Sequence, residues 1–272
     1  MIMRSTLFGL ALSLLMSGIV GAQAPTVPGA TDNEGGFGLP DQRGRRLLVV
    51  PKLTRPELLH AALCGDHRVP VQFERGQRES AGSDGRQTSR SFDRLAGSVF
   101  TVVGTDAVTP DTPCFLASDA FMAGSIVLRV GAPQGPESCR EPGRFAAVRD
   151  RRVVHCWPLA RLGPDAQVVL VEFERRGTDA LASVVLVDGA RTIFADLHAE
   201  FRKAGEDLWR VDDGGVLSPR GLTIVGALRR RAGYALGTAW AGTEGRSLSL
   251  WIADGSDRFT EVVNDYWYQA PD

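Results

Sequence analysis

Short apolar segments separated by turn residues fill the last hundred or so residues of the chain, from Ala166 to Tyr268. Val, Ile, Phe, Trp and Thr dominate these segments, and Gly, Asp or Asn separates each segment from the next. The segments are QVVLVEFERR, LASVVLVDG, TIFADLH, LTIVGALRRR, YALGTAWAG, SLSLWIADG and FTEVV. β-Branched and aromatic residues favour strands, whereas glycine, aspartate and asparagine favour tight turns. The pattern therefore predicts an antiparallel β-meander.

The alternation within these segments indicates how the strands pack, because successive side chains of a strand point to opposite faces. In Ser247–Ile252 (SLSLWI), leucine and isoleucine alternate with serine and tryptophan, and in Tyr234–Trp240 bulky residues alternate with alanine and glycine. Such strands suit a sandwich, a barrel or a propeller blade. Helical crossovers, which a parallel sheet needs, are nearly absent. We predict a mainly β fold, with an antiparallel meander forming a sandwich, barrel or propeller-like domain and one or two short helices.

A weak internal repeat is visible between Glu174–Ser183 (ERRGTDALAS) and Arg229–Thr238 (RRRAGYALGT). Its spacing suits a repeated unit of three or four strands, such as a propeller blade. Few positions agree, however, so we favour two hairpins that use the same turn chemistry independently.

The clearest helix signal precedes the meander, in Glu57–Cys64 (ELLHAALC). Thr54 and Glu57 have the spacing of a capping box, and Gly65 is suited to end a helix. We therefore predict a short helix here. His60 lies within it, and a single histidine on a short helix favours a structural or exposed position over a catalytic one.

Other segments before the meander predict further strands and one loop. The region Glu74–Ser91 is polar with almost no apolar residue and predicts a mobile loop. RFAAV and VVHCW, joined by RDR, predict a hairpin, and Asp196 is placed to begin a short helix inside the meander. The predicted strands are Leu47–Val50, Val69–Phe73, Ser98–Val103, Cys114–Leu116 and Ser125–Val130.

The first residues have the features of a secretory signal peptide. Arg4 supplies a positive charge, and Leu7–Val20 is apolar but too short to span a membrane comfortably. Small residues follow, and we predict cleavage after Ala22. This leader predicts export to the periplasm or the cell exterior and has a bacterial form.

The remaining chain predicts one folded region. Residues 1–22 are the predicted signal peptide, and residues 23–46, rich in glycine and proline, a flexible leader. Residues 47–272 form a single β-rich domain, with a possible subdivision near residue 162. No second long apolar run occurs, so we expect no membrane span in the mature chain.

The four cysteines, Cys64, Cys114, Cys139 and Cys156, all lie after the predicted cleavage point. An even number of cysteines in an exported protein favours disulfides. Four cysteines allow three pairings, and we favour Cys64–Cys114 with Cys139–Cys156 because sequence neighbours close the shorter loops. A metal site is less consistent with the sequence, because it contains no C-x-x-C and its histidines lack paired ligand spacing.

Composition narrows the function only slightly. The chain has 272 residues, with 43% hydrophobic and 23% charged residues, as in an ordinary globular protein. Its formal net charge of -1 gives no overall attraction to nucleic acid. The basic runs at Arg43–Arg46, Arg149–Arg152 and Arg229–Arg231 are short and indicate solvated loops and hairpin tips. We therefore expect no nucleic-acid partner.

A search for catalytic motifs finds no G-x-S-x-G, H-E-x-x-H, Walker loop or Rossmann glycine pattern, and predicts no cofactor. His155 and Cys156 are adjacent in a predicted strand and would point to opposite faces. Glu172 and Glu174 share a strand face and are the only carboxylates that suggest acid–base chemistry. The aspartates of DDGG and DGSD do not match a calcium loop, so no metal site is predicted.

The aromatic run Tyr266, Trp267 and Tyr268 follows the last predicted strand. It is suited to cover an end of the core, or else to form a stacking surface for a sugar or peptide. The sequence thus favours an exported, non-enzymatic protein that binds an unknown ligand or an envelope protein. The rival hypothesis is a periplasmic or secreted hydrolase whose site assembles from scattered carboxylates and histidines.

Overall fold

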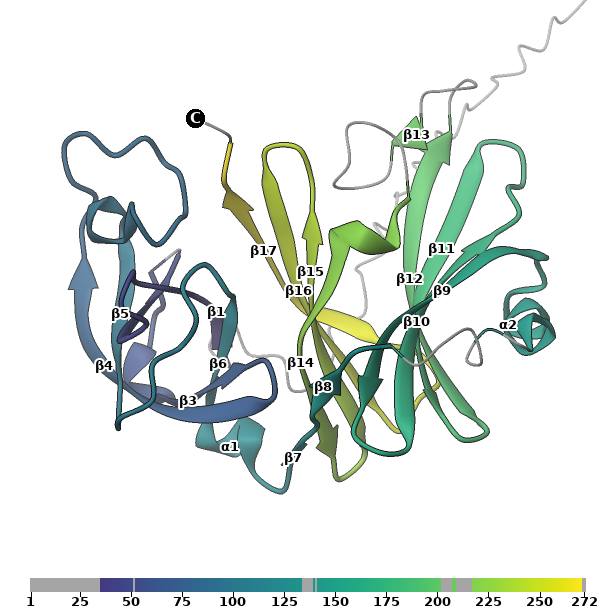
Figure 1. The fold of residues 1–272 in the computed structure, drawn as a ribbon, viewed down its shortest axis with the longest axis horizontal. Helices are drawn as coiled ribbons and strands as arrows, with labels where there is room; N and C mark the ends of the chain where they lie inside the picture. Colours follow the sequence, from purple (N-terminus) through teal and green to yellow (C-terminus); the bar gives the residue numbers. More distant parts are fainter. Residues whose placement is uncertain are drawn as a thin grey trace, which may run out of the picture. The chain divides into compact units, whose positions relative to one another are not determined.

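Antiparallel strands build almost the whole structure, a computed structural model that describes residues 35–50, 52–133, 139, 141–201, 207–208 and 217–270. The strands form a closed six-stranded barrel and two further sheets (Figure 1). The predicted mainly β fold is therefore confirmed. The predicted signal peptide and the first part of the predicted leader lie outside the described residues.

The barrel comes first along the chain and has the strand order β1-β2-β5-β4-β3-β6. Its strands are β1 (Gly35–Pro40), β2 (Arg46–Val49), β3 (Leu59–Cys64), β4 (His67–Gln77), β5 (Gly97–Val102) and β6 (Cys114–Ser118). Buried residues such as Leu47, Phe100 and Leu116 form one core cluster of the barrel. The predicted strands at β2, β4, β5 and β6 are confirmed, with shifted ends.

The segment Gly35–Pro40 corrects one prediction, because it is a buried barrel strand and not part of a flexible leader. Its glycines permit close packing. A Cβ added at Gly38 would lie 2.5 Å from Cδ1 of Leu116, so a side chain there would collide with the neighbouring strand β6. Glycine marks a close approach of two strands here, although the same composition also suits a flexible segment.

The predicted helix over Glu57–Cys64 is wrong. Pro56–Leu58 forms a single 3-10 turn, after which β3 pairs with β4 on one side and β6 on the other. Ala62 packs in one core cluster and Leu63 in another, so both faces of the strand are buried. These tertiary contacts outweigh a local capping signal.

The seven predicted meander segments are all strands, but they are divided between two sheets. The first sheet contains β8 (Val130–Gly131), β9 (Val153–Leu162), β10 (Ala166–Phe173), β11 (Asp179–Asp188), β12 (Arg191–Phe201) and β13 (Asp207–Leu208). The second contains β7 (Ile126–Val127), β14 (Leu222–Arg230), β15 (Gly233–Ala241), β16 (Gly245–Asp254) and β17 (Thr260–Tyr268). The two repeated sequences lie at the β10–β11 hairpin and the β14–β15 hairpin, in different sheets.

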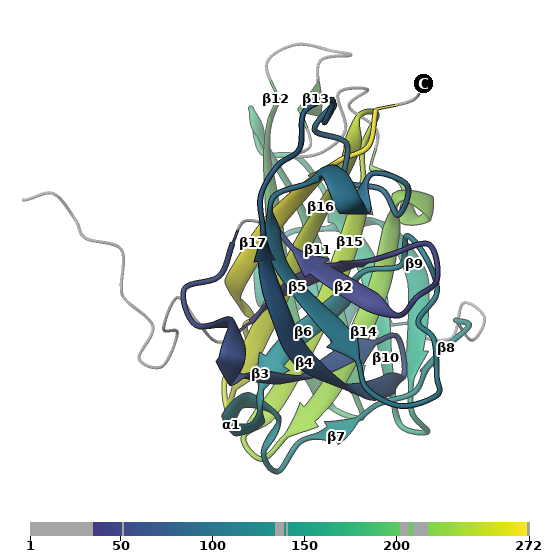
Figure 2. The same ribbon diagram turned by 90° about the vertical axis from the view of Figure 1, so that its left-hand side faces the viewer.

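The two sheets pack face to face around one large core that includes Leu170, Leu186, Leu236 and Trp251. The other face of the β14–β17 sheet packs against the barrel, where Leu248 and its neighbours share a core with barrel residues. Figure 2 shows the barrel strands in front of this sheet. The β14–β17 sheet is thus buried on both faces, which explains why apolar residues occur on both faces of its strands.

One end of this two-sheet sandwich is tied by hydrogen bonds. The backbone N–H of Phe194 in β12 donates to the carbonyl of Asp257 at 3.0 Å. The Tyr234 hydroxyl of β15 donates to the Asp188 carboxylate of β11 at 2.5 Å. Burial and the hydrogen bond to Asp188 raise the pKa of Tyr234, so its hydroxyl keeps its proton. The bonds fix the two sheets to each other beside the β11–β12 hairpin.

Helix α2 (Pro142–Arg149) corrects the predicted RFAAV hairpin. Proline opens the helix, and Phe145 is buried against Phe194 on the outer face of the β9–β12 sheet, with ring centroids 6.4 Å apart. A four-residue helix, α1 (Asp119–Met122), follows β6. The helix predicted to begin at Asp196 is also wrong, because Asp196 lies within β12 and pairs with Ser183 of β11.

The polar region predicted as a mobile loop is anchored at several points. Strand β4 extends into it as far as Gln77, whose side-chain amide donates to the carbonyls of Phe92 and Leu95. Farther along, the N–H of Gln87 donates to the carbonyl of Tyr268 at 2.7 Å. The loop therefore joins the barrel to the end of β17.

The cysteines form the disulfides Cys64–Cys114 and Cys139–Cys156, which is the pairing favoured from the sequence. The first joins β3 to β6 within the barrel, and the second joins the segment before α2 to β9. Two disulfides are typical of proteins that fold outside the reducing cytosol. None of the helices in the described part of the chain has the length and apolar character needed to cross a membrane.

Candidate functional site

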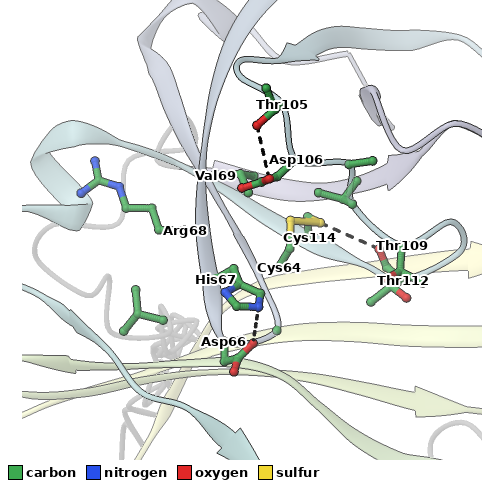
Figure 3. A pocket seen from close by; sticks show the side chains of 14 residues that line it. Cys64, Asp66, His67, Arg68, Val69, Thr105, Asp106, Thr109, Thr112 and Cys114 are labelled. Atoms are coloured by element: carbon green, nitrogen blue, oxygen red, sulfur yellow. Dashed lines mark hydrogen bonds and ion pairs between the residues drawn. A yellow bond between two sulfur atoms is a disulfide. The ribbon is translucent and has the colours of Figure 1, made fainter.

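A cavity of about 1000 Å³ opens where the barrel meets the edge of the second sheet (Figure 3). Its walls come from the β3–β4 turn, the loop between β5 and β6, and β7. The lining residues are Cys64, Gly65, Asp66, His67, Arg68, Val69, Thr105, Asp106, Ala107, Val108, Thr109, Thr112, Cys114 and Val127. We refer to this cavity as the barrel-edge pocket.

The walls of the barrel-edge pocket are held from three sides. The Cys64–Cys114 disulfide joins β3 to the start of β6. The N–H of Gly65 donates to the carbonyl of Val225 in β14 at 2.9 Å, which ties the β3–β4 turn to the second sheet. On the third side, the buried Val108 donates its N–H to the carbonyl of Gly44 at 2.9 Å. The pocket is therefore largely formed before any ligand enters.

Polar side chains surround the disulfide in this pocket. Figure 3 shows Asp66 and His67 on one side of the disulfide and Asp106 on the other. The His67 ring and the Asp66 carboxylate lie 3.0 Å apart, and the Thr105 hydroxyl donates to Asp106 at 3.5 Å. Val69, Val108, Val127 and the disulfide add apolar surface to the lining. Apolar surface with a few polar groups is typical of a ligand-binding site.

Among the described residues, no hydrogen bond joins His67 to a threonine of the pocket. His67 is bonded to Asp66 and is largely exposed, with 78% of its side chain accessible. The Thr105 hydroxyl is paired with the Asp106 carboxylate instead.

A second candidate lies on the first sheet, where His155 of β9 and Glu172 of β10 are register partners. Nδ1 of His155 lies 2.8 Å from Oε2 of Glu172, and the imidazole stacks on Trp157 with centroids 5.1 Å apart. The Glu172 side chain is only 18% exposed, whereas that of His155 is 57% exposed. The carboxylate and the indole thus orient an imidazole that is more than half exposed, which is the geometry of a general base or a hydrogen-bonding group.

Glu174 has a different environment from Glu172, although the sequence placed both on one strand face. Strand β10 ends at Phe173, and Oε1 of Glu174 accepts a hydrogen bond from Arg152 at 2.9 Å. This hydrogen bond, with the charge of Arg152, lowers the pKa of Glu174. Glu174 is therefore ionised at neutral pH and unsuited to act as a general acid. His155 and Cys156 point to opposite faces, since Cys156 turns to its disulfide while His155 bonds Glu172.

The aromatic run at the C-terminal end lies inside β17 and not after it. Trp267 is 1% exposed and packs in the core between the β14–β17 sheet and the barrel. The side chains of Tyr266 and Tyr268 point to the opposite face and remain 49% and 37% exposed. Trp267 therefore covers the core, and the predicted stacking surface is reduced to the two tyrosines.

Asp265 is a titratable residue in a partly buried position that the sequence did not indicate. It lies on the barrel-facing side of β17, where its carboxylate accepts the N–H of Phe37 in β1 at 3.3 Å. The partner strand β2 pairs only with Gly38–Pro40, so Asp265 satisfies an N–H that β2 does not reach. Burial raises the pKa of Asp265. The alternation of β17 places Asp265 beside Trp267, but only the docked barrel explains its burial.

The remaining candidate residues have structural roles. His60 is exposed on β3, with Nδ1 3.0 Å from the Asp119 carboxylate. In the DGSD turn, Asp254 lies 3.5 Å from Nη1 of Arg230. The DDGG segment at 212–215 lies outside the described residues. Within the described ranges, no group of three or more His, Cys, Asp or Glu side chains is arranged to hold a metal ion.

No family model, curated protein or solved structure matches the chain. The function therefore has to be argued from the chemistry of these sites.

Proposed function

We propose that this protein is an exported, non-enzymatic binding protein whose ligand occupies the barrel-edge pocket. The observation that carries the proposal is the pocket itself, a cavity of about 1000 Å³ lined by both polar and apolar residues. A disulfide and backbone hydrogen bonds fix its walls, so little conformational entropy is lost when a ligand binds. The sequence contains none of the catalytic motifs named above, which supports binding over catalysis.

The cellular location belongs to the same proposal. The apolar leader with Arg4 and the two disulfides support transfer to the periplasm or the cell exterior. Fractionation of expressing bacteria tests this, together with N-terminal sequencing of the mature chain. Cleavage after Ala22 predicts a mature chain that begins at Gln23.

Ligand binding is tested by amide NMR on the mature, oxidised protein with mixtures of amino acids, sugars and short peptides. A pocket ligand is expected to shift the amides of Gly65–Val69 and Thr105–Thr112 and few others. The variant Thr109→Trp should block the pocket and abolish these shifts, whereas Thr260→Trp, at an exposed site on β17, should not. Shifts centred on Tyr266 and Tyr268 would instead assign the ligand to the two exposed tyrosines.

A hydrolase is the second candidate function, and the contact between His155 and Glu172 is the specific observation that favours it. An imidazole oriented by a carboxylate can remove a proton from water in a hydrolytic reaction. Ester, peptide and glycoside substrates assayed with His155→Gln and Glu172→Gln test this function. The matched control is His198→Gln, since His198 is exposed on β12 and lies 3.9 Å from Asp179. Activity that survives both substitutions would reject the second candidate.

A further inference from the structure

We infer that the barrel-edge pocket recognises an organic cation, namely the guanidinium or ammonium group of a small molecule or of a basic side chain. The inference rests on the proposed function, because it names the class of ligand for the same pocket.

The charged side chains of the pocket lining indicate the charge of the ligand. Asp66 and Asp106 both line it, on opposite sides of the disulfide (Figure 3). The only arginine of the lining, Arg68, has its guanidinium bonded to Asp119 at 3.4 Å, and Asp119 is not part of the lining. The cavity thus has two carboxylates against one arginine that is engaged elsewhere. Asp66 contacts His67 and the exposed Arg129, whereas Asp106 contributes a negative charge to the lining that favours a cationic ligand over an anionic one.

No residue that the structure describes supplies a cationic partner to Asp106. Its one hydrogen-bonding partner among the described residues is the neutral hydroxyl of Thr105. An ionised carboxylate accepts several hydrogen bonds, and those to a guanidinium or ammonium group are stronger than those to a neutral donor. Asp106 therefore has capacity for a ligand that supplies charged N–H groups.

The chain itself places a guanidinium beside Asp66, the other carboxylate of the pocket. Nε of Arg129 lies 3.7 Å from Oδ2 of Asp66, and the Arg129 side chain is 84% exposed. An ion pair this exposed contributes little to stability, so a ligand guanidinium can replace it at small cost. Arg129 shows which chemical group the Asp66 carboxylate accepts.

The rest of the pocket fits an organic cation better than a metal ion. Thr109 and Thr112 offer hydroxyl oxygens for further N–H donors, of which a guanidinium has five. Val69, Val108 and the disulfide offer an apolar surface for the methylene stem of such a ligand. Among the described side chains no metal-binding group of three His, Cys, Asp or Glu residues is present, here or elsewhere.

The experiment compares N-acetyl-arginine amide with N-acetyl-citrulline amide by amide NMR titration of the mature, oxidised protein. Citrulline has the same length and shape as arginine, but its urea group is neutral. The arginine derivative should shift the pocket amides and bind about tenfold more tightly than the citrulline derivative. Added salt should weaken only the arginine complex.

Variants locate the cation. Asp66→Asn and Asp106→Asn should each weaken arginine binding about tenfold and leave citrulline binding unchanged. Asp257→Asn is the matched control, because it removes the same charge from an exposed turn that is not part of the pocket lining, and it should leave arginine binding within about twofold. A glycine–serine octapeptide with one central arginine distinguishes the sources. Tighter binding than the amide assigns the cation to a protein side chain, and equal binding assigns it to a free small molecule.

Each contrary result has a distinct meaning. Equal binding of arginine and citrulline derivatives, or unchanged binding in Asp106→Asn, would overturn the inferred cation specificity. Pocket shifts caused by neutral sugars or by anions, with none from arginine, would overturn it while leaving the proposed binding function intact. If no class of ligand shifts the pocket amides, both the inference and the proposed function fail.

Discussion

The barrel and the two-sheet sandwich are both antiparallel, but their strands are specified in different ways. The barrel strand β2 has four residues and β6 has five, and neighbouring strands such as β2 and β5 are distant in sequence. In the sandwich, β11 has ten residues, and each of the strands β9 to β12 pairs with the next in the chain. Long strands joined by hairpins carry their own signal, whereas short strands depend on partners that are far away along the chain.

Apart from β4, the barrel strands have four to six residues, and close packing and a covalent link support them. Gly38 allows β1 to approach β6, and Cys64–Cys114 joins β3 to β6. The sandwich depends instead on a large apolar core between its sheets. The candidate pocket lies beside the region of closer constraint, where the barrel meets the sheet edge. Four comparisons of variants test this contrast.

Trp267 should have the largest effect, because it packs in the core that joins the sandwich to the barrel. Trp267→Ala should reduce the free energy of unfolding by about 3–5 kcal/mol. Its neighbour Tyr266 is half exposed, so Tyr266→Ala should cost about 1 kcal/mol or less. Urea denaturation of both variants measures the difference. Equal losses would contradict the assignment of Trp267 to the shared core.

The disulfide that closes the longer loop should contribute more to the free energy of unfolding. Replacing Cys64 and Cys114 by alanine opens a loop of sequence separation 50 and should cost about 4 kcal/mol. The same change at Cys139 and Cys156, with separation 17, should cost about 3 kcal/mol. Guanidinium denaturation under oxidising conditions compares them. A larger loss of stability on removal of Cys139–Cys156 would contradict the expectation that the barrel disulfide contributes more than the second disulfide.

Gly44 and Gly65 form a matched pair, since both have a left-handed φ, of 64° and 65°. A Cβ at Gly44 would lie 1.9 Å from the carbonyl oxygen of Val108, whereas one at Gly65 would have no neighbour within 4 Å. Gly65→Ala should therefore cost about 1 kcal/mol, from the backbone conformation alone. Gly44→Ala should cost about 2–3 kcal/mol because of the added collision.

Thermal unfolding measures both glycine variants, and amide shifts in Thr105–Thr112 report on the pocket wall. Gly44→Ala should shift those amides, because Val108 is bonded to Gly44. Equal melting temperatures for the two variants would show that the pocket wall moves freely to accept a side chain.

Asp265 gives the smallest effect and a dependence on pH. Burial raises its pKa in the folded protein, so ionisation of the carboxylate destabilises the folded state. Below about pH 4 the group is protonated in both states and this destabilisation is absent. It grows as the pH rises from the ordinary pKa of aspartate through the raised pKa of the folded state, and is complete above that value.

Asp265→Asn removes that charge and keeps an oxygen that can accept the N–H of Phe37. The variant should be more stable than the original protein at pH 7, and the gap should close as the pH falls. Melting temperatures measured between pH 3 and pH 8 test this. A variant that is less stable at pH 7 would show that the charge of Asp265 has a favourable partner at the barrel.

The candidate sites were predictable only in part. The sequence identified Tyr266 and Tyr268, and it selected Glu172 as a carboxylate of interest. It did not connect Glu172 to His155, because their contact depends on the register of β9 against β10. It also did not find Asp66 and Asp106, which are ordinary turn and loop residues until the barrel closes around the disulfide.

The sequence by itself determined the mainly β fold, the seven long strands of the sandwich and the favoured disulfide pairing. Alternation, turn residues and loop length act over a few neighbours along the chain, so one sequence is sufficient to predict them. Only the tertiary structure decided that Leu59–Cys64 is a strand, that RFAAV is helical and that the meander divides into two sheets. At these places burial against distant residues has a larger free energy than the local preference, even where that preference is a clear helix signal, as in Glu57–Cys64. The pocket belongs to this second group, because its walls come from three segments that meet only in the folded protein.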